Sequence, residues 1–543
     1  MRFVLASIVL AVAAAAVAAR AQDDIVFRAM QDEMDRSMKQ LQLENLDKPY
    51  FISYRVEDED STTASASFGG LASSNQNRLR MLRVEVRVGS YQLDNTNYSH
   101  GLLESLSVLA STKYLPLDDD YTELRRQIWL ATDGAYKKAT EDLARKRAAL
   151  LNKNIIDLPP DFTQEKPAQT VVTAAPVHAD RAAWEAEART LSALFRQMPE
   201  IADSGVAFSA SNLHIRYLNS EGTRYTIDRP NVGFSANAIA QATDGRTITD
   251  STTIHVRTLQ DLPPAEELTA RIRALSKRLK EVRDAAVLDT YTGPVLFESN
   301  AAPQLFRLNF ASDLEARRRA LPDNLQNASN FDPSEGHFID KIGERVLPKF
   351  LSVTDNPTID TLDGKPIDGF CKIDDDGLPT HEIKLVADGN LQTLLTTRNP
   401  VRGFDHSSAS RHGNGAAPTN LIVTAEDGLS SEDLRAKLLE QVKQQNKDYG
   451  IVVRRMHNSS QPLLAWKVYA DGHEEEIRGV EFSGLGASSF KKIAAAGSQP
   501  NLLNEGTVTY AVPSLLFKEL TLHKLRGETP TLPLLPHPFF DGK

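Results

Sequence analysis

The sequence predicts an α+β protein with a mixed α/β N-terminal domain that contains long helices, followed by a β-rich C-terminal domain. Three observations lead to this prediction. Runs of alternating apolar and polar residues, which are typical of half-buried strands, recur along the chain. Long segments with helical spacing of apolar residues lie mainly in the first half. A chain of 543 residues is also too long to fold around a single core.

The N-terminus has the features of a secretory signal peptide. Met1-Arg2 gives a positive start, an apolar run follows, and Ala19-Arg20-Ala21 gives a small-residue cleavage site. No later segment is apolar over the length needed to span a bilayer. We therefore expect an exported protein, periplasmic or secreted, without stable membrane insertion. A retained N-terminal anchor is the alternative.

Composition limits the function further. The single cysteine, Cys371, excludes an intramolecular disulfide framework, so stability must come from the domain cores. The formal net charge of −10 is spread along the chain and argues against binding to nucleic acid.

The first half begins with a helical stripe over 22–45. Two strands are then predicted at 50–56 and 82–89, because apolar and polar residues alternate there. The intervening 61–80 is rich in Ser, Ala, Gly and Asn and is predicted to be a loop or weak strand.

Further helices and strands follow in the first half. Helices are predicted over 118–152 and 182–198, three or four strands over 206–256, and a helix from Pro263-Pro264 to about residue 286. Helices that alternate with strands in this way indicate an α+β domain.

The second half is dense in strands and turns. A strand over 293–298 leads into helical spacing over 301–314, and a later helix is predicted over 429–445. The strand 381–386 follows an acidic turn, Asp374 to Asp376. That turn lacks the ligand ladder of a calcium loop, so we expect solvated carboxylates there.

The stretch from Tyr291 to Glu315, with the hairpin and glycine-containing loops after it, resembles the TldD/PmbA family of zinc metallopeptidases. Active members carry His-Glu-x-x-x-His on the helix of this strand-turn-helix unit. The three motif positions fall on Arg307, Leu308 and Ser312 in this sequence. The resemblance covers about 250 C-terminal residues well and implies a barrel-like C-terminal domain.

The residues at these positions are unsuited to zinc chemistry. Arginine has no lone pair to offer, leucine cannot act as a base, and serine is a poor zinc ligand. The family's third ligand is a cysteine in a glycine-rich turn near the C-terminus, and the matching stretch 501–506 contains none. The resemblance therefore implies no catalytic residue and no cofactor in this chain.

A relocated zinc site is the alternative. Asp405, His406 and His412 form the best remaining cluster of ligand types, in a Ser/Gly-rich loop. The five-residue gap between the two histidines fits no standard zinc pattern, and surface histidines in a loop are the simpler interpretation.

These observations predict a zinc-less, non-catalytic subunit or scaffold that assists peptide processing. The resemblance implies a partner, either a second copy of the chain or a zinc-bearing paralogue, because active family members work with a sibling subunit that lacks the metal motif. An unfolded peptide could bind as an added strand. An active metallopeptidase with relocated ligands and a secreted binding protein without a peptidase role remain alternatives.

The predicted organisation has five parts. They are a signal peptide (1–21), an N-terminal α+β domain (22–265), a linking helix (266–287), a C-terminal β-rich domain (288–528) and a Pro-rich tail (529–543).

Overall fold

The computed structural model describes residues 24–99, 112–153, 158–242, 244–322, 336–526 and 537–540. The predicted signal peptide and most of the Pro-rich tail lie outside these residues. No helix in the described ranges is both long enough and apolar enough to cross a membrane.

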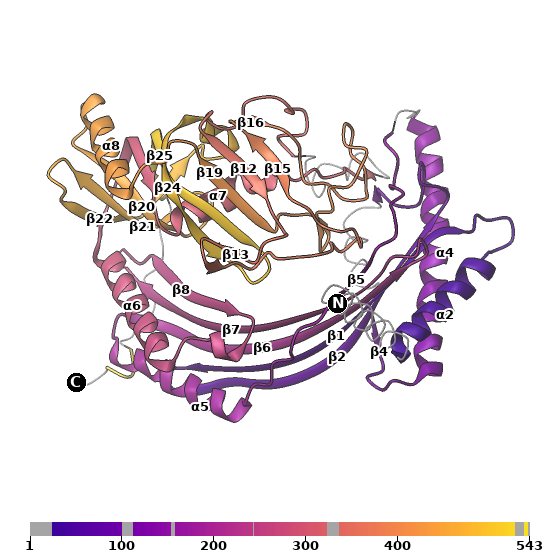
Figure 1. The fold of residues 1–543 in the computed structure, drawn as a ribbon. Helices are drawn as coiled ribbons and strands as arrows, with labels where there is room; N and C mark the ends of the chain where they lie inside the picture. The colour runs from indigo at the N-terminus through magenta and orange to yellow at the C-terminus, as the bar shows by residue number, and fades with distance from the viewer. Residues whose placement is uncertain are drawn as a thin grey trace, which may run out of the picture.

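The N-terminal half is built on a strongly curved sheet (Figure 1). Its strands pair in the order β4 (Lys113–Leu115), β2 (Gly70–Val88), β1 (Pro49–Ser67), β6 (Ile201–Asn219), β7 (Arg224–Gln241) and β5 (Gln169–Val172), with β8 (Thr247–Val256) also paired to β7. The long central strands are antiparallel neighbours, as expected from the alternating pattern.

Of the two predictions for 61–80, a loop or a weak strand, the structure shows a strand. The β1–β2 hairpin continues through this stretch and turns only at Phe68-Gly69, where both residues have positive φ. Small residues gave a weak strand signal, but Ala64 and Ala66 are buried against the core beneath the sheet. Pairing of β1 with both β2 and β6 stabilises the extended conformation despite the composition.

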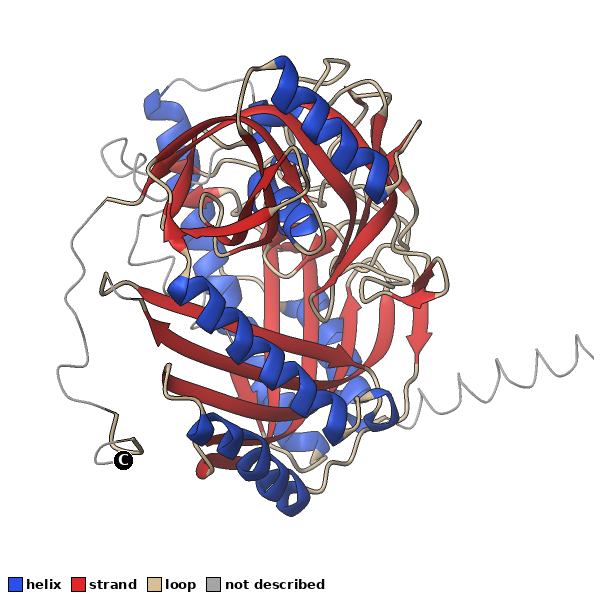
Figure 2. Ribbon diagram, turned by 90° about the vertical axis from the view of Figure 1, so that its left-hand side faces the viewer, coloured by secondary structure: helices blue, strands red, loops and turns tan. Residues whose placement is uncertain are grey.

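Two pairs of helices cover the convex side of this sheet (Figures 1 and 2). Helices α2 (Ile25–Gln40) and α4 (Tyr121–Lys153) pack on β1 and β2. Helix α5 (Arg181–Ser192) packs on β1, β6 and β2, and α6 (Ala265–Asp284) packs on β7 and β8. These helices match four predicted segments. Helix α6, predicted as a linker, buries Leu268, Ile272 and Leu275 in the core of the first sheet.

The C-terminal half contains a second large sheet, which confirms the α+β class. Its main path runs β16 (Asn390–Leu391), β15 (Ile383–Ala387), β12 (Leu351–Asp355), β19 (Asn420–Ala425), β25 (Thr509–Lys524), β10 (Thr290–Phe297), β20 (Tyr449–Met456), β21 (Pro462–Tyr469), β22 (Glu474–Arg478) and β9 (Ala286–Val287). Strands β23 (Val480–Ser483) and β24 (Ile493–Asn504) pair with β25.

Smaller elements complete this half. Helices α7 (Ala301–Asn309) and α8 (Ser431–Gln444) accompany the second sheet. Three short ladders join β3 (Tyr98–Ser99) to β11 (Leu321–Pro322), β13 (Thr361–Leu362) to β14 (Lys365–Pro366), and β17 (Arg411–His412) to β18 (Gly415–Ala416).

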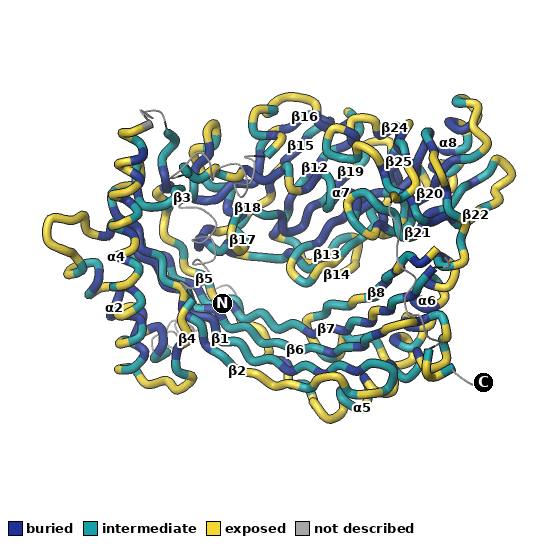
Figure 3. Tube along the Cα trace, turned by 180° about the vertical axis from the view of Figure 1, so that it is seen from behind, coloured by how far each residue is buried: buried dark blue, intermediate teal, exposed yellow. Residues whose placement is uncertain are grey.

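The two halves face each other across the concave side of the first sheet, and buried residues occur on both sides of this seam (Figure 3). Tyr217 and Tyr225 of the first sheet pack with Ile373 from a loop of the C-terminal half. The seam therefore combines apolar contact with the polar contacts described below.

Candidate functional site

The strand-turn-helix unit of the sequence forms as β10 followed by α7. Ala301, Ala302, Leu305 and Phe306 are buried on one face of the helix, and Pro303 is tolerated because it lies in the first turn. This burial fixes the helix against the second sheet. Arg307 lies on the other side and is 36% exposed.

The predicted helix over 301–314 is too long. Helix α7 ends at Asn309, Phe310 leaves the helical region with φ of −137°, and a separate 3₁₀ helix spans Ala311–Leu314. Phe310 is fully buried, and it packs edge-on to Phe338 and close to Phe490. The break places Ser312 outside the helix that carries Arg307 and Leu308.

The structure brings Arg307 to the β24–β25 turn, which is the stretch aligned with the family's cysteine ligand. The Nε atom of Arg307 lies 3.3 Å from Oε1 of Glu505. This is an ion pair without hydrogen-bond geometry at Nε, since that atom has no hydrogen-bond partner in the described structure. Leu308 packs against the core, and Ser312 is exposed.

The turn itself is held from two sides. Gly506 has φ of +83°, a conformation that favours glycine, and its N–H donates to Oδ2 of Asp368 at 2.6 Å. Burial raises the pKa of Asp368, while this hydrogen bond and the nearby His255 act against the rise. His255 comes from β8 of the first sheet and lies against Gly506. The motif region therefore touches the N-terminal half.

A buried tyrosine lies behind the ion pair. Burial, with a smaller effect from the Glu505 carboxylate, raises the pKa of Tyr510 to about 12, and Arg307 acts in the opposite direction. The phenol thus stays protonated near neutral pH. The carboxyl groups of Asp355 and Glu315 also raise the pKa of Tyr510.

Two of these carboxyl groups are themselves perturbed by burial. Burial raises the pKa of Asp355 to about 6, although the side chain accepts hydrogen bonds from N and Oγ1 of Thr419 at 2.9 and 3.1 Å. Burial also raises the pKa of Glu315, against the effect of Arg317. Within the described ranges, no group of three or more His, Cys, Asp and Glu side chains is placed to hold a metal ion.

Two models of the PmbA/TldA metallopeptidase family match this sequence. The C-terminal domain model matches residues 290–524 and the central domain model matches residues 175–282, together more than half of the chain. The chain belongs to the TldD/PmbA family. No protein with a curated description matches it.

Solved structures show that the TldD/PmbA fold extends over most of the chain. A proposed modulator of a DNA gyrase from Thermotoga maritima is 15% identical, with a TM-score of 0.58, over 91% of this chain and 100% of its own. TldE from Thermococcus kodakarensis is 12% identical, with a TM-score of 0.57, over 91% and 99%. A proposed modulator of DNA gyrase from Bacteroides thetaiotaomicron is 13% identical, with a TM-score of 0.58, over 92% and 98%. At these identities the likeness shows the fold alone.

A zinc ion of the TldD/PmbA type does not fit the residues at the motif positions. The guanidinium of Arg307 is a permanent cation that repels a metal ion, and its neighbour Glu505 is engaged by it. Leu308 supplies no donor. Cys371, the only cysteine, donates its thiol to the carbonyl of Ile373 at 2.8 Å, and burial raises its pKa.

The alternative zinc ligands occupy different environments. Asp405 and His406 are exposed in their loop. His412 lies in β17 beside Asp375, where burial lowers the pKa of its imidazole against the effect of that carboxylate. The buried Nε2 atom of His412 has no hydrogen-bond partner among the described residues.

The acidic turn before β15 is not solvated, and that prediction was wrong. Asp374 is 1% exposed and Asp376 is 7% exposed. Asp375 pairs with Arg55 of β1 at 2.8 Å, which, with a hydrogen bond from Gly413, lowers the pKa of Asp375 to about 2 despite burial. The turn is buried because its carboxylates have partners: Leu378 and Arg411 donate backbone N–H groups to Asp374, Arg398 donates its backbone N–H to Asp376, and Asp375 pairs with Arg55 across the seam.

Arg398 makes several contacts across this seam. Its guanidinium donates to both carboxylate oxygens of Glu221, at 2.7 and 2.8 Å, and to the carbonyl of Thr163. It also stacks on Phe162 at 3.9 Å from the ring centroid. We call the ion pairs Arg55–Asp375 and Arg398–Glu221, which join the two halves, the seam network.

Sequence reasoning identified the turn containing Glu505 but not Glu505 itself. The signal was available, because Glu505 is the only charged residue in the matched stretch 501–506. His255 and Asp368 gave no signal, since each is a single polar residue in an ordinary strand or turn.

Proposed function

We propose that this chain is a non-catalytic member of the TldD/PmbA family that serves as a subunit or scaffold in peptide processing. The observation that carries the proposal is the Arg307–Glu505 ion pair at the aligned metal positions. A peptidase zinc needs neutral or anionic ligands, an open position for water and a nearby base. Arg307 and Leu308 supply no ligand, Ser312 is a poor one, and the carboxylate of Glu505 is engaged by Arg307.

The proposal includes a partner. A zinc-bearing paralogue would form a heterodimer and supply the chemistry that this chain lacks, and a second copy would form a homodimer. An unfolded peptide is the proposed cargo, held in the extended conformation that main-chain pairing favours. We also propose that the chain acts outside the cytoplasm, on the basis of its predicted signal peptide and cleavage site.

A reconstitution assay tests this function. The full chain is incubated with a fluorescently labelled unfolded polypeptide, alone and with a zinc-bearing TldD-type protein from the same source. We expect no hydrolysis by the chain alone, with or without added zinc. We expect the zinc-bearing protein to cleave faster when the chain is present than when it is absent.

The other outcomes separate the alternatives. Hydrolysis by the chain alone that a zinc chelator abolishes would show an active metallopeptidase, and the variants His406→Ala and His412→Ala would then locate its ligands. A chain that neither associates with the zinc-bearing protein nor binds the polypeptide would support a binding protein without a peptidase role.

A further inference from the structure

Strand β2, at the outer edge of the first sheet, has a stretch whose main chain is unpaired on one side (Figures 1 and 3). Strand β1 pairs with β2 along its length. In the described part of the chain, the other side of β2 meets a strand only at Arg80 to Leu82, where β4 lies. Most side chains of 73–79 are exposed. We call residues 73–79 the open edge.

Contacts near the other end of β2 show which of its main-chain groups face away from β1. The C=O of Val86 accepts from the side-chain amide of Asn95 at 3.2 Å, so this carbonyl points to the outer side. The residue opposite Val86 on β1 is Ile52, which directs its own N–H and C=O to Ser220, on the far side of β1. Ile52 and Val86 therefore share no main-chain hydrogen bond.

The same alternation extends to the open edge. The pairing of β2 with β1 has no register shift between Ser73 and Arg87. Main-chain groups of successive residues in an antiparallel strand point to opposite sides. The N–H and C=O groups of Ser74, Gln76 and Arg78 therefore point away from β1, and within the described ranges they have no hydrogen-bond partner.

The open edge has a defined length. At one end, Ala72 is a bulge residue without a partner on β1, because Leu71 and Ser73 pair with consecutive residues of that strand. At the other end, β4 begins to pair at Arg80, and Pro116, which has no N–H, follows β4. The open edge therefore has room for one extended segment of about seven residues.

The residues that commonly protect exposed strand edges are missing here. The open edge contains no proline and no lysine. Its single charged residue, Arg78, lies opposite Asp60 of β1. The edge is thus open to a further strand by composition as well as by position.

The geometry of the open edge fits an extended peptide and excludes a second copy of the sheet. A second β2, paired antiparallel about the middle residue Gln76, would place its own residues 70–72 opposite 80–82, where β4 already lies. A short peptide has no such overlap. Strand β4 is itself a short antiparallel segment on this edge, so a peptide would continue an existing pairing.

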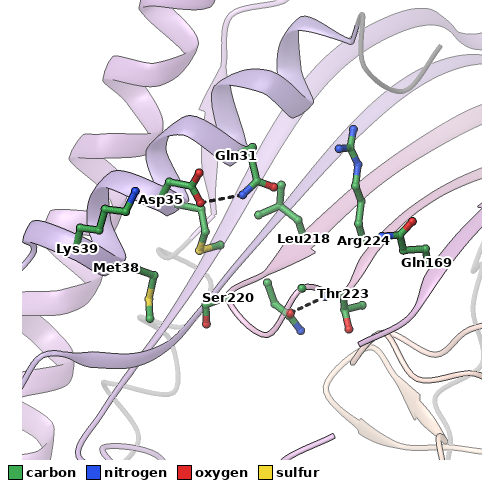
Figure 4. Close-up of a pocket in the computed structure, with 12 residues that line it drawn as sticks. Gln31, Asp35, Met38, Lys39, Gln169, Leu218, Ser220, Thr223 and Arg224 are labelled. Atoms are coloured by element: carbon green, nitrogen blue, oxygen red, sulfur yellow. Dashed lines mark hydrogen bonds between the residues drawn. The ribbon is translucent and has the colours of Figure 1, made fainter. Parts of the chain in front are cut away.

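The groove between α2 and the β6–β7 turn offers no comparable site (Figure 4). Met34 and Leu218, which line it, are each 2% exposed and belong to the core. The turn beside them is closed by its own hydrogen bonds, since Oδ1 of Asn219 accepts from the N–H groups of Glu221 and Thr223. The groove therefore serves as an internal reference in the test below.

We propose that the open edge binds an extended peptide as an added antiparallel strand, through the main-chain groups of Ser74, Gln76 and Arg78. The proposal rests on the proposed function, in which an unfolded peptide is the cargo, and names the site that holds it. Main-chain hydrogen bonds supply the affinity, so peptides of different sequence can bind.

Hydrogen exchange of the full chain tests the proposal, with a fluorescently labelled peptide of alternating Thr and Val as the probe. We expect the amides of Ser74, Gln76 and Arg78 to exchange at least about tenfold more slowly at saturating peptide. The groove segments 31–39 and 218–224 should exchange at an unchanged rate. The same peptide with all its amide nitrogens methylated should give no protection, because it has no N–H to donate.

Gln76→Pro and Gln76→Ala form a matched pair of variants. Proline removes the outward N–H of residue 76 and leaves the hydrogen bonds between β2 and β1 in place, whereas alanine removes only the side chain. Gln76→Pro should weaken peptide binding about fivefold or more, and Gln76→Ala less than about twofold. Fluorescence anisotropy measures the affinities, and the melting temperature shows that each variant is folded.

Three results would overturn the proposal. They are unchanged exchange over 73–79 at saturating peptide, equal protection by the methylated peptide, and equal affinities of Gln76→Pro and Gln76→Ala. If Gln76→Pro unfolds the chain, the exchange experiment with the two peptides still decides the outcome. Protection of 73–79 without faster cleavage by the zinc-bearing protein would support the peptide site and contradict the subunit role alone.

Discussion

The motif ion pair and the seam network both consist of charged side chains, but they differ in burial. Arg307 and Glu505 are each 36% exposed and approach in one contact of 3.3 Å. Arg398 is 1% exposed and makes two hydrogen bonds to one carboxylate. An exposed pair contributes little to stability, whereas a buried cation that loses its partner is costly. The motif ion pair is thus expected to contribute little to the stability of the fold, and the seam network to contribute much more.

The largest loss of stability is expected from Arg398→Ala. The change leaves the carboxylate of Glu221 without its bidentate partner at the seam, and we expect a loss of about 3–5 kcal/mol in the free energy of unfolding. Arg273→Ala on the exposed face of α6 is the control and should change stability by less than about 0.5 kcal/mol. Chemical denaturation measures both. Equal, small losses would show that the seam network does not hold the two halves together.

A smaller change in stability is expected from the titration of Asp355, the buried carboxyl group next to the motif region. Its folded-state pKa of about 6 lies above the ordinary value of 3.8, so the folded protein keeps a proton that the unfolded chain releases. The resulting stability is fully present below about pH 4 and is lost as the pH rises through about 6. The loss amounts to about 3 kcal/mol for a shift of this size.

Asp355→Asn isolates this effect, because an amide does not titrate and its oxygen can still accept from Thr419. The difference in stability between variant and parent should move in favour of the variant from pH 4 to pH 7. Thr424→Ser, on the neighbouring β19, is a control that should leave the pH dependence unchanged. A constant difference across this range would mean that Asp355 titrates normally.

The smallest effect is expected at the motif ion pair. A double-mutant cycle with Arg307→Ala and Glu505→Ala should give a coupling energy below about 1 kcal/mol. The exposed pair of Glu267 and Arg271 on α6, with side chains 48% and 43% exposed, is the matched control. A coupling of several kcal/mol at Arg307 and Glu505, well above the control, would remove the contrast between the two regions.

Local patterns in the sequence predicted most of the fold. Apolar periodicity identified α2, α4, α5, α6 and α8. The remaining differences have tertiary causes. The small residues of 61–80 become strand because β6 and β2 pair with β1 on both sides, and the helix at 301–314 ends early because Phe310 is drawn into an aromatic cluster.

The candidate site also has a part that the local sequence predicted and a part that depends on tertiary contacts. Alignment to a known motif located Arg307 and the turn of Glu505, because these depend on local sequence. The seam network was out of reach, since Arg398 and Glu221 are 177 residues apart and neither lies in a recognisable pattern. The prediction of a solvated acidic turn failed for this reason, because the cation that pairs with Asp375 is Arg55 of β1, 320 residues away.

Zinc content per chain tests the central claim most directly. The full chain is purified without added metal and without a histidine tag, and zinc is measured against protein concentration. The account predicts far less than one zinc per chain, because Arg307, Leu308 and Ser312 offer no suitable ligand set. About one zinc per chain, retained through dialysis, would contradict it.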